Sequence, residues 1–397
     1  MPDVSFTGLT LVAAAAFGAP LLLGLLPRLR LPAVVLEIVA GIVMGPSVLG
    51  WVHLDTPIRI LSLLGLTMLL FLAGLEVDPS RFKGRFLTTS LVGFVVSFGL
   101  ALALSAALDG IGIVQRPLLV AITLSATSLG LIVPVLKDVG EAASQLGQLT
   151  IAASSVADFA TVVLLSLFFS REATSTGAKL VLLGGFVVLA AVGGITVAGA
   201  GRSKRLSATL LRLQDTTAEI RVRGAILLLV GFLALAQHLG IEVILAAFIA
   251  GAVLKLVDRD VMATHPKFPI KLDAIGYGFL IPVFFVSSGV TFDLHALFHG
   301  AGALVRIPLF LLVLLVVRGV PALLYRPLVG SRRATAAGLL QATSLPFIVT
   351  ATQIGLALKA INPTNASALV AAGLLSVLIF PASALQVLGK AGRPEPR

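Results

Sequence analysis

The sequence predicts an all-α, polytopic membrane protein with about 13 transmembrane helices, and three observations support this fold class. Hydrophobic residues make up 58% of the 397 positions, whereas charged residues make up only 12%. The apolar stretches recur along the chain, each close to the roughly 20 residues that a helix needs to cross a bilayer. The sequence also lacks the short alternating strands of a membrane β-barrel.

The opening run is preceded by Asp3 and by no basic residue, so it lacks the positive segment of a signal peptide and is expected to be the first membrane helix. We expect residues 1–397 to form one transmembrane domain with no soluble regulatory domain. The expected helices lie near 7–26, 33–51, 58–76, 87–108, 117–136, 146–169, 178–199, 220–239, 242–256, 272–291, 302–325, 334–358 and 365–388.

The net charge of +11 is better explained by membrane topology than by nucleic-acid binding, because the basic residues are spread over many short loops. If the N-terminus is placed outside and the helices alternate, most of the 29 Lys and Arg residues fall in cytoplasmic loops. The C-terminus is then cytoplasmic as well. The chain has no cysteine, which excludes disulfides and thiolate metal sites.

Two apolar runs contain nearly the same polar interruption. Leu124–Gly130 reads LSATSLG and Leu340–Pro346 reads LQATSLP, so Ala-Thr-Ser-Leu is followed by Gly or Pro in each. Helix breakers at membrane depth are tolerated only where protein or a water-filled cavity covers the freed backbone. A matched pair of interrupted helices indicates the binding site of a secondary transporter. We therefore expect two broken helices that cross.

Further matches extend this similarity. Gly74–Asp78 is echoed by Gly289–Asp293, and Ala40–Gly41 is echoed by Ala250–Gly251. Each matched pair of helices is seven helices apart, an odd number, so the two members cross the membrane in opposite directions. The sequence thus predicts an inverted-topology repeat, with a first repeat at about 7–170, a linking helix at about 178–199 and a second repeat at about 220–388.

Asp158 is the strongest candidate for an ion- or proton-binding residue. It lies near the middle of an expected helix, and no other charge occurs between Glu141 and Arg171. A carboxylate at that depth is costly and usually lines an ion or proton path, although a structural Asp bonded to a neighbouring helix is the alternative. Because it could hold either a proton or a cation, Asp158 could couple two opposed fluxes.

Small hydroxyl residues lie near this carboxylate or in the two interruptions. Thr127 and Ser128, with Thr343 and Ser344 in the second crossing helix, could offer hydroxyls and freed carbonyls to a desolvated ion. Ser154, one turn before Asp158, could share the ligand set. The alternative is that these small polar residues allow close helix packing.

Arg318 is a candidate supporting charge within the eleventh helix, with snorkelling to the headgroups as the alternative. Glu37, Glu76 and Glu242 fall near expected helix ends, where a solvated or cavity-mouth position is a simpler interpretation than ligation. Phosphate-binding glycine loops, Ser/His/Asp arrangements and zinc motifs are all lacking. We therefore expect no enzyme activity, no cofactor and no metal beyond a transported monovalent cation.

Four segments together resemble the monovalent cation:proton antiporter-2 family: Leu31–Gly50, Leu70–Asp78, Ser125–Ser128 and Ile281–Phe285. The resemblance covers essentially the whole chain. It implies a homodimer in the bacterial inner membrane that exchanges Na⁺ or K⁺ for H⁺ by an elevator-like movement of a core domain beside a dimerisation domain. It also implies two unwound helices that cross beside an essential aspartate, which Asp158 matches, with Thr127, Ser128 and Arg318 at further motif positions.

Two positions depart from the family pattern. Many members have an acidic or amide residue before the aspartate, where this chain has Ala157, and the late basic residue is commonly Lys rather than Arg318. Both departures favour electroneutral exchange, because Arg cannot release a proton. Some relatives end in a nucleotide-binding regulatory domain, so regulation of that kind would need a separate subunit.

Two other functions remain open at this point: a sodium-coupled solute symporter of related fold, and a non-transporting membrane sensor. The sequence does not decide between Na⁺, K⁺ and Li⁺. It also leaves the stoichiometry, the pH dependence, the direction of flux and the regulation open.

Overall fold

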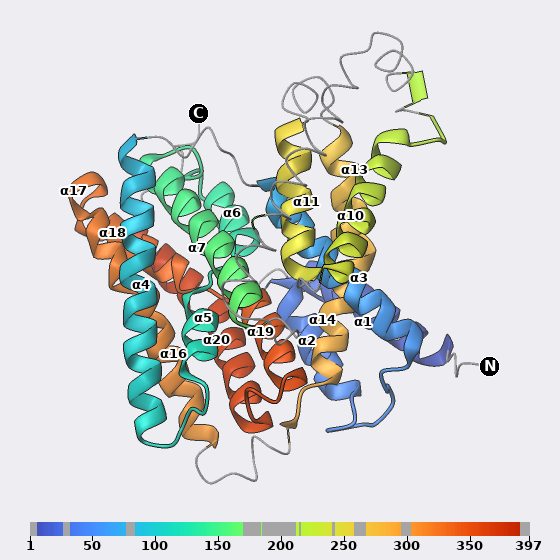
Figure 1. The fold of residues 1–397 in the computed structure, drawn as a ribbon, viewed down its shortest axis with the longest axis horizontal. Helices are drawn as coiled ribbons and strands as arrows, with labels where there is room; N and C mark the ends of the chain where they lie inside the picture. The colour runs from blue at the N-terminus through green and yellow to red at the C-terminus, as the bar shows by residue number, and fades with distance from the viewer. Residues whose placement is uncertain are drawn as a thin grey trace. The chain divides into compact units, whose positions relative to one another are not determined.

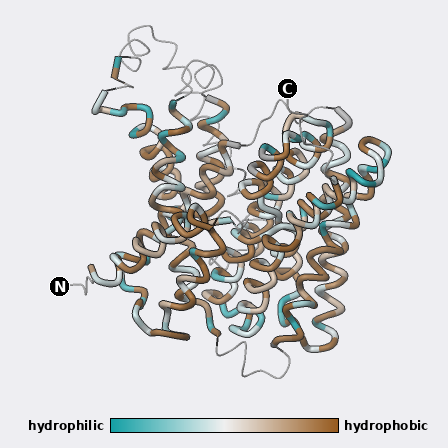
Figure 2. Tube along the Cα trace, turned by 180° about the vertical axis from the view of Figure 1, so that it is seen from behind, coloured by the Kyte–Doolittle hydropathy of each residue, from teal (hydrophilic) through white to brown (hydrophobic). Residues whose placement is uncertain are grey.

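The computed structural model describes residues 6–26, 32–76, 84–169, 184, 212–213, 216–239, 243–257, 267–294 and 303–389. Within these ranges the chain is helical, with short connections and no strand. Nine helices there are long and apolar enough to cross a membrane, and three shorter apolar helices accompany them. Figure 2 shows that hydrophobic residues dominate these helices. The all-α, polytopic membrane fold class is therefore confirmed, while the expected helix at 178–199, apart from residue 184, lies outside the described residues.

The chain forms two compact units. The first comprises the described residues of Met1–Ala16, Leu54–Asp78 and Ser166–Ser287, and the second those of Phe17–His53, Pro79–Leu165 and Ser288–Arg397. Both interrupted helices and Asp158 belong to the second unit.

The first unit is organised by the close contact of α3 (Thr56–Glu76) with α11 (Val243–Val257). A Cβ atom on Gly74 would lie 2.1 Å from the Phe248 carbonyl oxygen, and one on Gly251 would lie 2.0 Å from the Phe71 carbonyl oxygen. Only glycine permits this approach of the two backbones. The unit also contains α10 (Ile220–His238), α13 (Lys267–Ile275), η1 (Gly276–Leu280) and parts of α1 (Phe6–Leu25) and α14 (Ile281–Val290).

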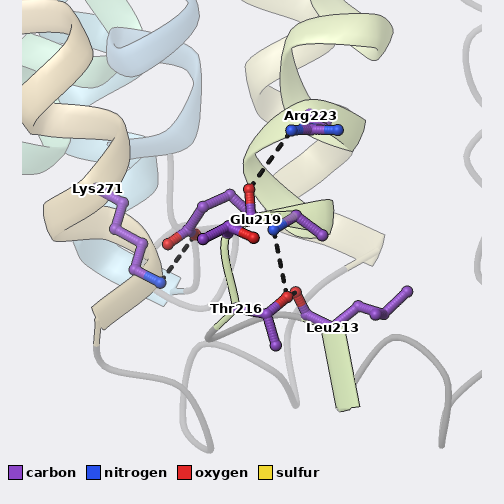
Figure 3. A network of polar contacts seen from close by, with 7 residues as sticks. Leu213, Thr216, Glu219, Arg223 and Lys271 are labelled. Carbon is purple, nitrogen blue, oxygen red and sulfur yellow. Dashed lines mark hydrogen bonds and ion pairs between the residues drawn. The ribbon is translucent and has the colours of Figure 1, made fainter.

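An ion pair joins α13 to the start of α10 (Figure 3). Glu219 precedes α10 in a left-handed conformation, with φ of 42°, and accepts a 2.8 Å hydrogen bond from Lys271 Nζ. Its backbone N–H donates to Thr216 O, and its carbonyl accepts from the Arg223 N–H, each at 3.0 Å. Because both charged side chains are partly exposed, the pair fixes geometry more than it stabilises the fold.

The second unit contains both interrupted helices, which Figure 1 shows as pairs of short segments. The first consists of α5 (Pro117–Ser125) and α6 (Leu129–Asp138), and the second of α18 (Ser331–Gln341) and α19 (Pro346–Ala357). Both breaks fall where the sequence predicts them. Pro346 stands at the first position of α19, where its missing N–H costs nothing.

Other helices of this unit pack against these segments, with α4 against α5, and α20 against α16, α18 and α19. The unit further contains α2 (Ala33–Met44), α4 (Gly84–Gly110), most of α7 (Gln145–Phe169), α16 (Ala303–Gly319), η2 (Pro321–Tyr325), α17 (Arg326–Val329) and α20 (Pro363–Leu388).

Some expected boundaries are wrong. The second helix ends at Met44 instead of residue 51, because Gly45 precedes Pro46 and the position before a proline disfavours helical geometry. The tenth begins at Lys267 rather than 272 and includes a π-helical turn at η1. The eleventh continues past 325, through η2 and α17, to Val329.

Gly289 of α14 meets α2 in the way that Gly74 meets α11. A Cβ atom on Gly289 would lie 2.1 Å from the Ile38 carbonyl oxygen and 2.9 Å from Gly41 Cα. The sequence pairs Gly74 with Gly289, and Gly41 with Gly251, as repeat-related positions. The inverted repeat stays a prediction, which these matched contacts support.

We expect Gly251→Ala to destabilise the protein by about 1–3 kcal/mol, because the new methyl group cannot fit against the Phe71 carbonyl. Thermal unfolding of the detergent-purified protein measures this effect. Gly231→Ala in α10 is the matched control, since no atom lies within 4 Å of its added Cβ. Equal melting temperatures for the two variants would contradict the close α3–α11 contact.

Candidate ion-binding site

The two interrupted helices meet through Thr127. Its hydroxyl donates to the carbonyl oxygen of Gln341 at 2.8 Å and lies 3.4 Å from the carbonyl oxygen of Thr343. Thr127 and Thr343 are fully buried, as is the backbone around them. Gln341 is the last residue of α18, so its carbonyl has no intrahelical partner. Thr127 lies in the break of the first helix, and its hydroxyl bonds the Gln341 carbonyl that the break of the second helix leaves without an intrahelical partner.

Asp158 lies against the N-terminal end of α6. The Leu129 N–H, at the first residue of that half-helix, donates to Asp158 Oδ2 at 3.4 Å. The carboxylate is 3% exposed. A helix N-terminus carries partial positive charge and unsatisfied N–H groups, so this position favours the ionised carboxylate, whereas burial disfavours it.

The face of α7 that carries Asp158 also carries two buried hydroxyls. Ser154 precedes Asp158 by four residues and Thr161 follows it by three, so all three share one side of the helix. Neither hydroxyl has a hydrogen-bond partner among the described residues. The same holds for the hydroxyls of Thr343 and Ser344 in the second break. Buried hydroxyls without a partner are rare, and a bound ion or water is one explanation for them.

The second break has a neutral partner where the first has a carboxylate. The Ser344 N–H donates to Ser376 Oγ at 3.2 Å, and Ser376 in turn donates to the Gly373 carbonyl at 2.7 Å. The Ser344 N–H in the second break is therefore bonded by a neutral hydroxyl. In the first break, the corresponding partner of the Leu129 N–H is the carboxylate of Asp158.

Arg318 belongs to the last turn of α16 and is 2% exposed. Its side chain reaches the C-terminal end of α18. Its Nε donates to Gln341 O at 3.5 Å, one terminal nitrogen to Gln341 Oε1 at 3.4 Å, and the other to Ser97 Oγ at 3.2 Å. The C-terminal end of a helix is partially negative, so it favours this cation. Asp158 adds a favourable electrostatic interaction. Arg318 therefore does not snorkel to the headgroups.

Several predicted residues come together at the crossing, and others were missed. Thr127 is hydrogen-bonded to α18, the first half of the second broken helix, and Asp158 to α6, the second half of the first broken helix. Arg318 is hydrogen-bonded to Gln341, beside the second break. Ser128 is buried between α5 and α6, at the position that precedes α6. Sequence reasoning did not identify Ser97, Thr161, Gln341 or Ser376. Gln341 could have been found, since it is a polar residue directly before the second Ala-Thr-Ser-Leu.

The structure contradicts a solvated position for Glu37, which lies inside α2 and is 5% exposed. The same helix also meets Gly289 of α14 at Ile38 and Gly41, a contact between distant residues that local sequence does not reveal. The side chains of Glu76 and Glu242 lie outside the described part of the chain. Within that part, no three His, Cys, Asp or Glu residues are grouped as metal ligands.

The comparisons with known proteins agree with this arrangement. The family model for the transmembrane sodium/hydrogen exchanger matches residues 13–388. YjbQ of Bacillus subtilis, by its name a candidate Na⁺/H⁺ antiporter, is 32% identical over 411 residues, covering 100% of this chain and 65% of YjbQ. GerN of Bacillus cereus, named an Na⁺/H⁺-K⁺ antiporter, is 30% identical over 276 residues, covering 67% of each chain.

The fold is similar to that of a solved structure, the sodium proton antiporter MjNhaP1 from Methanocaldococcus jannaschii. The TM-score is 0.62 at 19% sequence identity, covering 96% of this chain and 99% of that one. The chain spans 65% of the length of YjbQ and 67% of that of GerN. The predicted resemblance to cation:proton antiporters is confirmed. By the match that extends from residue 13 to residue 388, this chain belongs to the sodium/hydrogen exchanger family.

Proposed function

We propose that this protein exchanges a monovalent cation, Na⁺ or K⁺, for H⁺ across the bacterial inner membrane. One observation carries the proposal. A buried carboxylate, Asp158, lies at the N-terminal end of a half-helix and shares its helix face with the partnerless hydroxyls of Ser154 and Thr161. Relatives named as Na⁺/H⁺ and Na⁺/H⁺-K⁺ antiporters support the choice of ions.

Cation and proton compete for Asp158 in this proposal. A dehydrated monovalent cation needs several oxygen ligands, and hard cations prefer carboxylate, hydroxyl and carbonyl oxygens. Asp158, Ser154 and Thr161 would supply three of them. Thr127 and Ser128, with the free carbonyls in the last turn of α5, would add others. Thr343 and Ser344 would contribute from the second break.

Neutralisation of Asp158 permits the exchange movement. A bare carboxylate is costly in an apolar surrounding, so the empty, ionised site should resist crossing the hydrophobic part of the membrane. Either bound cation or bound proton removes that charge. Because one excludes the other, each crossing carries one ion, and the two crossings together exchange a cation for a proton.

Exchange should be electroneutral. The residue before Asp158 is Ala157, so the site has a single carboxylate at this point of α7. Arg318 is permanently charged and hydrogen-bonded at the end of α18, so it offers no second proton to the cycle. One cation then exchanges for one proton.

The remaining architecture follows from the sequence pattern. We propose one transmembrane domain with an inverted repeat, the N-terminus outside and the C-terminus cytoplasmic. The placement of Lys and Arg supports this orientation, and the matched contacts of Gly74 and Gly289 support the repeat. The protein would act as a homodimer and transporter without enzyme activity, and a separate subunit could regulate it.

We expect Asp158→Asn to abolish cation-dependent proton release, because an amide binds neither a proton nor a cation as a carboxylate does. Inside-out vesicles with a pH-sensitive dye measure the release after separate additions of Na⁺, Li⁺ and K⁺. Asp109→Asn, which changes an exposed carboxylate of α4, should transport normally. Exchange that persists in correctly inserted Asp158→Asn would refute the site, and a requirement for an organic solute would favour a symporter.

We expect an imposed membrane potential to leave the initial rate of Na⁺-driven proton movement unchanged in proteoliposomes. A cycle that moved one net charge would instead feel about 2.3 kcal/mol per 100 mV. Liposomes without protein, under the same potential, report the passive proton leak. A potential-dependent rate above that leak would show that the exchange is electrogenic.

A further inference from the structure

Arg318 is a buried cation whose three hydrogen bonds all go to neutral acceptors. These are the backbone and side-chain oxygens of Gln341 and the hydroxyl of Ser97. Asp158 attracts the guanidinium electrostatically. A buried charge gains strongly from a carboxylate partner. The arginine would therefore compete with the transported cation for Asp158 unless other groups held it at the end of α18.

Gln341 supplies two of the three acceptors. Its carbonyl oxygen lies at the negative end of α18, where the helix dipole adds to the hydrogen bond. Its side chain is an amide, which has an acceptor oxygen and a donor nitrogen. Only the orientation that turns Oε1 towards Arg318 holds the guanidinium, because the opposite orientation places two donors against each other.

Tyr325 anchors this amide through both of its polar atoms. Gln341 Nε2 donates to the Tyr325 hydroxyl at 3.1 Å, and the same hydroxyl lies 3.3 Å from Oε1, which also accepts from Arg318 at 3.4 Å. Tyr325 is buried in η2 and packs in one apolar cluster with Leu149 and Ala153 of α7 and Ala337 of α18. This packing therefore holds the Tyr325 hydroxyl in one position beside the amide of Gln341.

We infer that Gln341 and Tyr325 are positioning residues for cation binding, which hold the guanidinium of Arg318 on α18 and keep it from occupying Asp158. The inference rests on the proposed exchange of cation and proton at Asp158. It also accounts for arginine at this position. A planar guanidinium reaches three acceptors in different directions, whereas a lysine ammonium is a single point charge.

Tyr325→Phe tests this role, because it removes the hydroxyl and keeps the ring in its apolar cluster. Without the hydroxyl the amide loses this anchor and holds Arg318 less firmly at the end of α18. Loss of one hydrogen bond corresponds to about a fivefold change in an equilibrium. We expect the apparent KM for Na⁺ to rise about fivefold, with the maximal rate within about twofold of wild type. Tyr277→Phe, at the chain's other tyrosine, is the control and should change neither.

Gln341→Glu separates positioning from packing. A carboxylate accepts through both oxygens and holds Arg318 in either orientation, so Tyr325 becomes dispensable. We expect Gln341→Glu to restore the KM of Tyr325→Phe in the double variant. A rise in KM that persists in that background, or a loss of maximal rate and thermal stability with unchanged KM, would overturn the inference in favour of a packing role.

A second readout is independent of transport. The Na⁺ concentration that gives half of the maximal thermal stabilisation of the purified protein reports cation binding directly. We expect this concentration to rise about fivefold in Tyr325→Phe and to return in the double variant. Wild type that neither exchanges nor binds Na⁺ or K⁺ would overturn the proposed function as well. Wild type that does both, beside an unchanged Tyr325→Phe, would overturn the positioning role alone.

Discussion

Two helices are interrupted within apolar surroundings, and the backbone groups that the interruptions free must find partners there. The structure meets this constraint with opposite charges at opposite half-helix ends. Asp158 accepts from the N–H at the start of α6, and Arg318 donates to the carbonyl at the end of α18. Thr127 joins the two breaks through that same carbonyl.

Each buried charge is bonded at a different half-helix end, Asp158 at the start of α6 and Arg318 at the end of α18. The partial charges of these helix ends offset part of the cost of burying each group. The guanidinium is bonded to Gln341 and Ser97. In the proposed exchange, a direct Asp–Arg pair would compete with the cation for the carboxylate, so this arrangement favours cation binding at Asp158.

Glycine contacts set the spacing of helices within each unit. Within the first unit, α3 and α11 approach until Gly74 and Gly251 each face a carbonyl oxygen of the other helix. Within the second unit, Gly289 meets α2 in the same manner. Side chains at these positions would push the backbones apart, so small residues fix the helix spacing where no hydrophobic driving force does so in a membrane.

The sequence by itself determined the membrane helices, the two breaks and the deeply placed Asp158, because hydropathy, Gly and Pro act on the residues that immediately surround them. The tertiary structure alone decided that Arg318 bonds to Gln341 and Ser97, that Tyr325 anchors that amide, and that Glu37 is buried. Those outcomes depend on which face of α2, α4, α16 and α18 meets which neighbour. Contacts between residues far apart in the chain set that choice, and local periodicity does not encode them.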